Sequence, residues 1–347
     1  MPISDYQLVE GWKHVLKLSK IGAGHVVTVL TSANTHAQTL STAMQAIASV
    51  GAVGNRLDVP PINGDKSFSR DRIAYLGQTA LTGNPAAVAA LKASDMVLDL
   101  MLLLFSPEQL DILESGTKIL LVIEPPEILM RMLPTEEDRD RVKAAASLLE
   151  KAKEMRVTSG AGTDLVLPLG QYPVICEYGF VDEPGRWDHW PSGFQFTWPN
   201  EGAAQGRIVL DRGDILLPQK CYLNGPIAMT VKDGYVTAIE GGTDAALLRD
   251  YMEGFEEPEA YAFSHVGWGV QHRARWSTMA LYDREAVVGQ DARSYAGNFM
   301  FSLGPNTEVG GARATKCHID IPVRGCTISL DGQPVIAEGK LLDNTEL

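Results

Sequence analysis

Short apolar runs alternate with amphipathic segments through the first 155 residues, and this alternation restricts the fold more than any other feature of the sequence. The apolar runs have the length and continuity of strands buried on both faces, and they lie at 26–30, 53–57, 96–104 and 118–123. Helices are predicted between and after them, at 38–49, 85–93 and 136–154. Because parallel strands need helical crossovers, the pattern predicts a three-layer α/β domain with a parallel sheet over residues 1–155.

Two helices in this part of the chain begin with clear capping signals. Asn84 and Ser106 each precede a proline at the first helical position. No G-x-G-x-x-G or P-loop pattern occurs here, so we do not expect this domain to bind a nucleotide. Leu104 and Phe105 end the long apolar run, at the edge where such sheets hold ligands, and we expect them to line a pocket.

From about residue 156 the chain changes to short strands separated by glycines. Strands are predicted at 209–211, 215–217, 227–231 and 235–239, with Lys232-Asp233-Gly234 as the turn of a hairpin. We therefore expect a second domain over residues 156–347, an α+β domain with a curved and mainly antiparallel sheet.

The overall charge and the cysteines exclude several classes of partner. The formal net charge is -13, and no cluster of Lys and Arg offers a cationic surface to phosphates, so no nucleic-acid partner is expected. The longest apolar run, 96–105, is interrupted by Asp99 and is too short to cross a bilayer, so no membrane partner is expected. The four cysteines show no C-x-x-C spacing, and the chain begins without a secretion-signal pattern; both features favour the cytoplasm.

His318 and Asp320 are the strongest candidates for chemistry. In an extended strand their side chains project from the same face and can grip one ion. His265, in a stretch of small and aromatic residues, is the best candidate for a third ligand. Two histidines and one carboxylate leave the other positions of a metal open, which suits non-haem Fe(II) and O2. The pattern H-x-D is short, so a histidine and an aspartate held by ordinary hydrogen bonds are the alternative.

A second group of candidate residues lies at 177–193. His189 stands between two tryptophans in a loop rich in proline and glycine, and Glu177 precedes this loop. Loops of this composition often carry binding groups, but an aromatic plug with a capped histidine is the alternative. Arg293 and Ser302 flank another glycine-bent stretch close to the H-x-D strand, and they are weaker candidates.

Several longer motifs are spread over nearly the whole chain. They are Thr79–Asn84 (TALTGN), Ser106–Gln109 (SPEQ), Glu124–Glu127 (EPPE), Leu169–Pro173 (LGQYP), Asp182–Asn200 (DEPGRWDHWPSGFQFTWPN), Gly304–Gly311 (GPNTEVGG) and Cys317–Pro322 (CHIDIP). Together they resemble the 2,5-dihydroxypyridine 5,6-dioxygenases, a family that is itself similar to the thermophilic-type dinuclear metallo-aminopeptidases. The resemblance implies that one Fe(II), held by His265, His318 and Asp320, is used with O2 to open a pyridine ring.

The same comparison separates the dioxygenases from the aminopeptidases. The aminopeptidase pattern G-E-V-F-T-A-P corresponds to 193–199, where Phe194 replaces the glutamate that helps to bind a metal pair. The pattern G-T-x-H-x-x-L-G corresponds to 297–304, where Met300 replaces the histidine. A two-metal hydrolytic site is therefore not expected, whereas a site for one metal remains.

The resemblance implies a ring-cleaving dioxygenase that converts 2,5-dihydroxypyridine and O2 to N-formylmaleamate. We expect Glu177 and His189 to orient the ring and to handle protons, with Leu104, Phe105, Arg293 and Ser302 as further substrate contacts. Members of the family can carry a histidine base where Phe105 stands here, so a differently substituted hydroxypyridine is a second candidate substrate. An aminopeptidase on the same fold and a non-catalytic binding protein are the competing hypotheses for function, and we expect a homo-oligomer.

Overall fold

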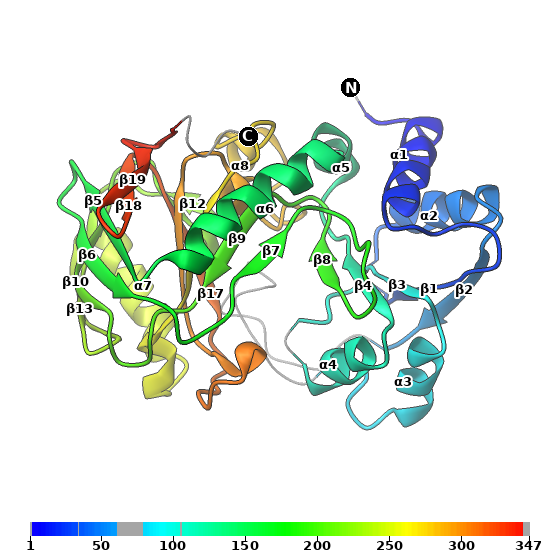
Figure 1. The fold of residues 1–347 in the computed structure, drawn as a ribbon, viewed down its shortest axis with the longest axis horizontal. Helices are drawn as coiled ribbons and strands as arrows, with labels where there is room; N and C mark the ends of the chain where they lie inside the picture. The colour runs from blue at the N-terminus through cyan, green and yellow to red at the C-terminus, as the bar shows by residue number, and fades with distance from the viewer. Residues whose placement is uncertain (1, 34, 61–78, 105, 343–347) are drawn as a thin grey trace. The chain divides into compact units, whose positions relative to one another are not determined.

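The computed structural model of the chain describes residues 2–33, 35–60, 79–104 and 106–342 (Figure 1). Phe105, a predicted pocket residue, lies outside these ranges. The described residues form two compact units. The first holds those up to Arg139 together with Glu177–Ser192, and the second holds Asp140–Cys176 and those from Gly193 onward. The two domains expected from the sequence, residues 1–155 and 156–347, stay a prediction.

The first unit is built on a five-stranded parallel sheet. In spatial order its strands are β2 (Val53–Asp58), β1 (Val26–Thr31), β3 (Met96–Asp99), β4 (Lys118–Leu121) and β8 (Trp187–His189). Figure 1 shows helices on both faces of this sheet, α1 (Asp5–Leu18) and α2 (Ala37–Ser49) on one and α3 (Pro85–Lys92) and α4 (Pro107–Glu114) on the other. The three layers and the parallel sheet predicted from the apolar alternation are confirmed.

The capping residues start their helices as predicted. Asn84 Oδ1 accepts a hydrogen bond from the N–H of Ala87 at 3.2 Å, and Ser106 Oγ accepts one from the N–H of Gln109 at 3.1 Å. Each bond satisfies an N–H group that the first turn of a helix would leave without a partner.

The strand predicted at 96–104 is wrong in its length, because β3 ends at Asp99. The carboxylate of Asp99 accepts hydrogen bonds from the N–H groups of Met101, Leu102 and Leu103, at 3.0, 2.8 and 2.5 Å. Leu102 also has a φ of +94°, outside the range of a strand. Because one side chain binds three successive amides, the chain leaves the sheet while its leucines stay buried.

The second unit contains three sheets. The largest has eight antiparallel strands in the order β14 (Tyr235–Gly241), β13 (Ile227–Lys232), β10 (Gln205–Leu210), β6 (Asp164–Pro168), β5 (Glu154–Ser159), β18 (Cys326–Leu330), β19 (Gln333–Ala337) and β20 (Lys340–Leu341). A five-stranded sheet has the order β17 (Ile319–Val323), β16 (Phe299–Leu303), β15 (Phe263–Gly269), β9 (Phe194–Thr197) and β7 (Ile175–Glu177). Strands β11 (Ile215–Leu216) and β12 (Cys221–Tyr222) form a separate antiparallel pair. The mainly antiparallel α+β prediction is confirmed.

The predicted hairpin between β13 and β14 turns at Asp233 and Gly234, with φ of +51° and +81°. Two positive φ values in succession give the twist that suits a tight hairpin. The remaining helices are α5 (Pro126–Arg131), α6 (Glu136–Lys151), α7 (Thr243–Glu253), α8 (Thr278–Leu281) and α9 (Gln290–Ser294). None of the helices in the described ranges has the length and apolar character needed to cross a membrane.

Candidate metal centre

The five-stranded sheet of the second unit brings the three predicted ligands together. His265 lies in β15, Asp320 lies in β17, and His318 stands directly before β17. Strand β16 pairs with both, so β15 and β17 flank it. The three side chains are buried, with exposed fractions of 4, 2 and 3% for His265, His318 and Asp320. Buried imidazole and carboxylate groups are costly unless they are paired or bind a metal ion, so their burial in one place is compatible with a metal site.

The ligand atoms converge on one point. His265 Nε2 lies 3.2 Å from His318 Nε2 and 3.2 Å from Asp320 Oδ1, and His318 Nε2 lies 3.7 Å from that oxygen. Ligand atoms bound about 2.1 Å from one ion stand about 3.0 to 3.4 Å apart at angles of about 90 to 109°. The donor set therefore fits a single metal ion. Among the described residues, these three form the group of His, Cys, Asp or Glu side chains whose possible ligand atoms all lie within 4.8 Å of one another.

Asp320 is held in its ionised form. Burial by itself would raise the pKa of its carboxyl, but the charges of His318 and Arg293 and the hydrogen bond from His265 outweigh burial and hold that pKa well below its usual range. Arg293 is itself buried, and it donates from Nε to Asp320 Oδ2 at 2.6 Å and from Nη1 to the carbonyl of Val288 at 2.8 Å. The guanidinium therefore fixes one carboxylate oxygen while the other faces the two histidines.

Aromatic packing and one backbone bond set the position of His265. Its ring centroid lies 4.6 Å from that of Phe196 and 5.6 Å from that of Trp198, the latter nearly edge-on at 74°. Its backbone N–H donates to Ser302 Oγ at 3.0 Å. Among the described residues, Nδ1 of His265 has no hydrogen-bond partner. The ring is thus oriented by its aromatic neighbours. In most metal-binding histidines a hydrogen bond from the second ring nitrogen does this instead.

The two positions that separate this chain from the aminopeptidase patterns are apolar in space as well as in sequence. Phe194 is 3% exposed and Met300 is fully buried, and both belong to one cluster with Phe196 and Trp198. A phenyl ring offers no donor atom, and a thioether is a soft ligand that does not replace the carboxylate and imidazole of a hydrolytic metal pair. The arrangement next to His265 therefore supports a mononuclear site.

Comparisons with known proteins now identify the family. A family model described as 2,5-dihydroxypyridine 5,6-dioxygenase matches residues 7–343. A curated 2,5-dihydroxypyridine 5,6-dioxygenase of Pseudomonas putida KT2440 is 52% identical over 342 residues, which cover 99% of this chain and 98% of that protein. The chain belongs to this dioxygenase family.

Two solved structures extend the comparison. The structure of the 2,5-dihydroxypyridine dioxygenase from Pseudomonas putida KT2440 matches with a TM-score of 0.97 and 51% identity, over 100% of both chains. AmpT from Thermus thermophilus matches with a TM-score of 0.62 and 14% identity, over 97% of this chain and 99% of that one. The likeness to AmpT shows the fold alone. The family resemblance drawn from the sequence motifs is confirmed.

Two of the predicted substrate contacts of this dioxygenase lie against the candidate metal ligands. Arg293 binds Asp320, and Ser302 accepts the N–H of His265 and stands opposite Asp320 in the pairing of β16 with β17. Both side chains are buried. Both therefore contact candidate ligands, and contact with a substrate stays a prediction for both.

The other predicted site residues belong to the first compact unit. Glu177 is 4% exposed, and its Oε2 accepts a hydrogen bond from Ser192 Oγ at 3.2 Å. His189 ends β8 and is fully buried, and Leu104 is 9% exposed. Their catalytic and substrate-binding roles stay predictions, as does that of Phe105.

Asp188 organises the backbone around Glu177 and His189. Its carboxylate accepts the N–H groups of Tyr178, Gly179 and His189, at 3.0, 3.0 and 2.7 Å. Burial raises the pKa of this carboxyl, and the charge of a neighbouring arginine opposes that shift. Sequence reasoning singled out His189 but missed this role of the preceding aspartate, because the bonds join segments ten residues apart.

Sequence reasoning also missed Glu308. Both of its carboxylate oxygens are shielded from solvent, and within the described ranges they have no hydrogen-bond partner other than the glutamate's own backbone N–H. Burial raises the pKa of Glu308 to about 7, and repulsion from Asp320 acts in the same direction. The motif at 304–311 contained this glutamate, but nothing local in a sequence marks a glutamate as buried.

Proposed function

We propose that this chain is an Fe(II)-dependent dioxygenase that converts 2,5-dihydroxypyridine and O2 to N-formylmaleamate. Both oxygen atoms enter the product, at C5 and C6, and the ring bond between those carbons breaks. The observation that carries the proposal is the convergence of His265, His318 and Asp320 in a chain that belongs to the 2,5-dihydroxypyridine 5,6-dioxygenase family along nearly its whole length.

Fe(II) is the metal we assign to the site. Two imidazoles and one carboxylate are the donors of non-haem Fe(II) oxygenases, and three neutral or singly charged ligands suit a divalent ion. When bound there, Fe(II) would let the electron-rich ring pass electron density to O2 through the metal's open positions. The buried pair of Arg293 and Asp320 keeps the carboxylate charged and fixed, so that it can act as a ligand.

The protein's own groups would bind and orient the ring. We assign Glu177 to accept the proton of the 5-hydroxyl and His189 to hold the ring, because the 2- and 5-oxygens are para and cannot chelate one metal together. Arg293 and Ser302 are assigned as further polar contacts, and Leu104 and Phe105 as parts of an apolar wall that excludes water. Residues 1–155 would form a scaffold domain that contributes this wall, and 156–347 the catalytic domain.

An aminopeptidase function has less support. A second metal would need ligands at the positions of Phe194 and Met300, and both are packed in an apolar cluster. A non-catalytic binding protein is also disfavoured, because the three ligand atoms keep the geometry that fits a metal.

We also propose that the protein works in the cytoplasm as a homo-oligomer. All four cysteines are free thiols, which agrees with a reducing compartment. Light scattering on purified protein measures the subunit number, and a monomer at micromolar concentration would rule out the oligomer.

The test of the function is oxygen uptake after anaerobic reconstitution with Fe(II). The protein is given 2,5-dihydroxypyridine, a panel of dihydroxypyridines with other substitution patterns, or a peptide with Zn2+ or Co2+. We expect one O2 to be consumed for each 2,5-dihydroxypyridine, with both atoms of 18O2 found in N-formylmaleamate by mass spectrometry. Preferred turnover of another ring would correct the substrate, and peptide release without oxygen uptake would overturn the proposal.

A further inference from the structure

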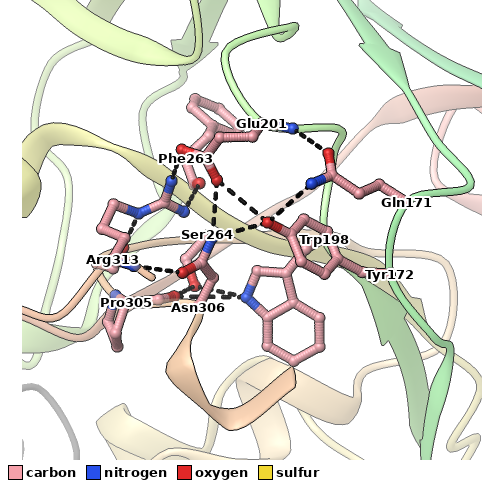
Figure 2. Close-up of polar contacts among 10 residues, drawn as sticks. Gln171, Tyr172, Trp198, Glu201, Phe263, Ser264, Pro305, Asn306 and Arg313 are labelled. Atoms are coloured by element: carbon pink, nitrogen blue, oxygen red, sulfur yellow. Dashed lines mark hydrogen bonds and ion pairs between the residues drawn. The ribbon is translucent and has the colours of Figure 1, made fainter. Parts of the chain in front are cut away.

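The loop between β16 and β17 connects two strands of the five-stranded sheet and ends at His318. One arginine in this loop, Arg313, binds it to the neighbouring strand ends. Arg313 donates from Nε to the carbonyl of Gly304 at 2.8 Å and from Nη2 to the carbonyl of Phe263 at 2.6 Å (Figure 2). Gly304 follows the last residue of β16, and Phe263 is the first residue of β15. The guanidinium therefore joins the ends of two paired strands, two residues away from His265.

The third nitrogen of this guanidinium donates to a glutamate on a separate segment of the chain. Arg313 Nη1 donates to Glu201 Oε1 at 2.5 Å, and the arginine side chain is only 8% exposed. Glu201 Oε2 accepts a hydrogen bond from Asn306 Nδ2 at 2.7 Å. A planar guanidinium with three fixed acceptors has little freedom to move, and a lysine could not reproduce the fork.

Asn306 closes the loop on itself. It is buried, its Oδ1 accepts the N–H of Arg313 at 2.9 Å, and its carbonyl accepts the N–H of Gly311 at 2.9 Å. A Cβ at Gly311 would lie 2.2 Å from the Asn306 side chain, so only glycine fits there. Hydrogen bonds within the loop thus fix its shape. Arg313 connects the loop to β15, and both Arg313 and Asn306 connect it to Glu201.

The same loop reaches His265 by a second route. Ser264 Oγ donates to the carbonyl of Pro305 at 2.6 Å and accepts a hydrogen bond from Trp198 Nε1 at 3.1 Å (Figure 2). Ser264 directly precedes His265, and the Trp198 ring packs against the imidazole. A shift of the loop would therefore move both the backbone and an aromatic neighbour of one ligand, while the other two ligands follow the loop on β17.

We propose that Glu201, Asn306 and Arg313 form a loop clamp that sets the position of His265 relative to His318 and Asp320, and through it the affinity of the site for a divalent metal. The three are positioning residues, since none is a candidate ligand. This inference rests on the proposed metal centre. An ion pair with one exposed partner stabilises a fold little, but Arg313 also satisfies the carbonyls at two strand ends close to His265. Its loss should therefore change the geometry of the ligands more than the stability of the fold.

The test compares Arg313→Met with a matched control, Arg156→Met. Arg156 also pairs with a carboxylate through two of its nitrogens, both 3.1 Å from Asp164, but it lies on the eight-stranded sheet. Co(II) is titrated into metal-free protein, and affinity and the visible absorption of the bound Co(II) are recorded. We expect Arg313→Met to weaken Co(II) binding by about tenfold to a hundredfold, as loss of outer contacts does at other sites, and to change the spectrum. Arg156→Met should leave both unchanged.

The possible results separate the clamp from the metal centre itself. A folded Arg313→Met protein with wild-type affinity and spectrum would overturn the clamp alone. If Arg313→Met does not fold, Glu201→Gln decides on the same criteria, because it keeps the size of a side chain that is 43% exposed. If the wild type fails to bind Co(II), or His318→Ala binds it equally well, the proposed metal centre falls, and the clamp falls with it.

Discussion

At the scale of single residues, the candidate centre depends on three side chains whose donor atoms lie 3.2 to 3.7 Å from one another. The sequence could predict two of them, because alternation along a strand places His318 and Asp320 on one face. It could suggest His265 only by its surroundings. What it could not supply is Arg293 on Asp320 or Phe196 against the ring of His265, since both contacts join residues more than twenty positions apart.

Loss of any one ligand should abolish metal binding while the chain still folds. We expect His265→Ala, His318→Ala and Asp320→Ala to bind no Fe(II) and to show no turnover, because two remaining donors hold a divalent ion too weakly. Metal analysis and circular dichroism after anaerobic reconstitution measure both properties. His272→Ala is the matched control, since His272 is exposed and should behave as the wild type. Full binding by any of the three ligand variants would remove that residue from the centre.

Glu308 should make the stability of the metal-free protein depend on pH. Burial raises its folded-state pKa from 4.5 to about 7. Between these values the folded chain holds a proton that the unfolded chain has lost, so the free energy of unfolding falls as the pH rises through this window. Glu308→Gln resembles the protonated form and avoids that loss. We expect the free energy of unfolding of Glu308→Gln, relative to that of the wild type, to increase by on the order of 2 kcal/mol between pH 5 and pH 8.

Urea unfolding at the two pH values measures this difference. Glu240→Gln makes the same chemical change at an exposed position of β14 and should show no such growth. A Glu308→Gln advantage that is equal at pH 5 and pH 8 would mean that Glu308 is not buried as a carboxyl group with a raised pKa.

At the scale of elements, local signals predicted starts better than ends. The caps at Asn84 and Ser106 could be read from the sequence, because a cap and a proline act within one turn. The end of β3 could not be predicted. The apolar run continues past Asp99, and nothing in the sequence shows that this carboxylate accepts hydrogen bonds from the N–H groups of Met101, Leu102 and Leu103. Nor could the place of β8 as the edge strand beside β4 be seen, since the pairing joins residues nearly seventy positions apart.

Strand β15 should tolerate no side chain at Gly267. A Cβ there would lie 2.0 Å from the carbonyl oxygen of Gln195 and 2.9 Å from Cα of Phe196, on the neighbouring strand β9. We expect Gly267→Ala to lower the free energy of unfolding by about 3 kcal/mol or more, because two paired strands must separate. Thermal unfolding measures it. At Gly160 no heavy atom lies within 4 Å of the added Cβ, so Gly160→Ala should change stability by less than about 0.5 kcal/mol; equal effects at the two positions would contradict the close pairing.

At the scale of the whole molecule, the sequence indicated one parallel and one mainly antiparallel architecture, and both are present. The prediction came from the change in sequence pattern, from long apolar runs before residue 156 to short strands separated by glycines after it. The return of Glu177–Ser192 to the first unit could not be predicted, because the segment lies among the glycine-separated strands in the sequence. Function could be reached from the sequence through the motifs spread along the chain, whereas composition alone pointed to no particular chemistry.

The central claim is that one divalent metal, held by His265, His318 and Asp320, supports ring opening. Its most direct measurement is a titration of metal-free protein with Fe(II) under anaerobic conditions, followed at each point by the initial rate of oxygen uptake with 2,5-dihydroxypyridine. We predict that the rate rises linearly and stops rising at one Fe(II) per chain, and that His318→Ala gives no rise. A break at two metal ions per chain, or full turnover before any Fe(II) is added, would contradict the account.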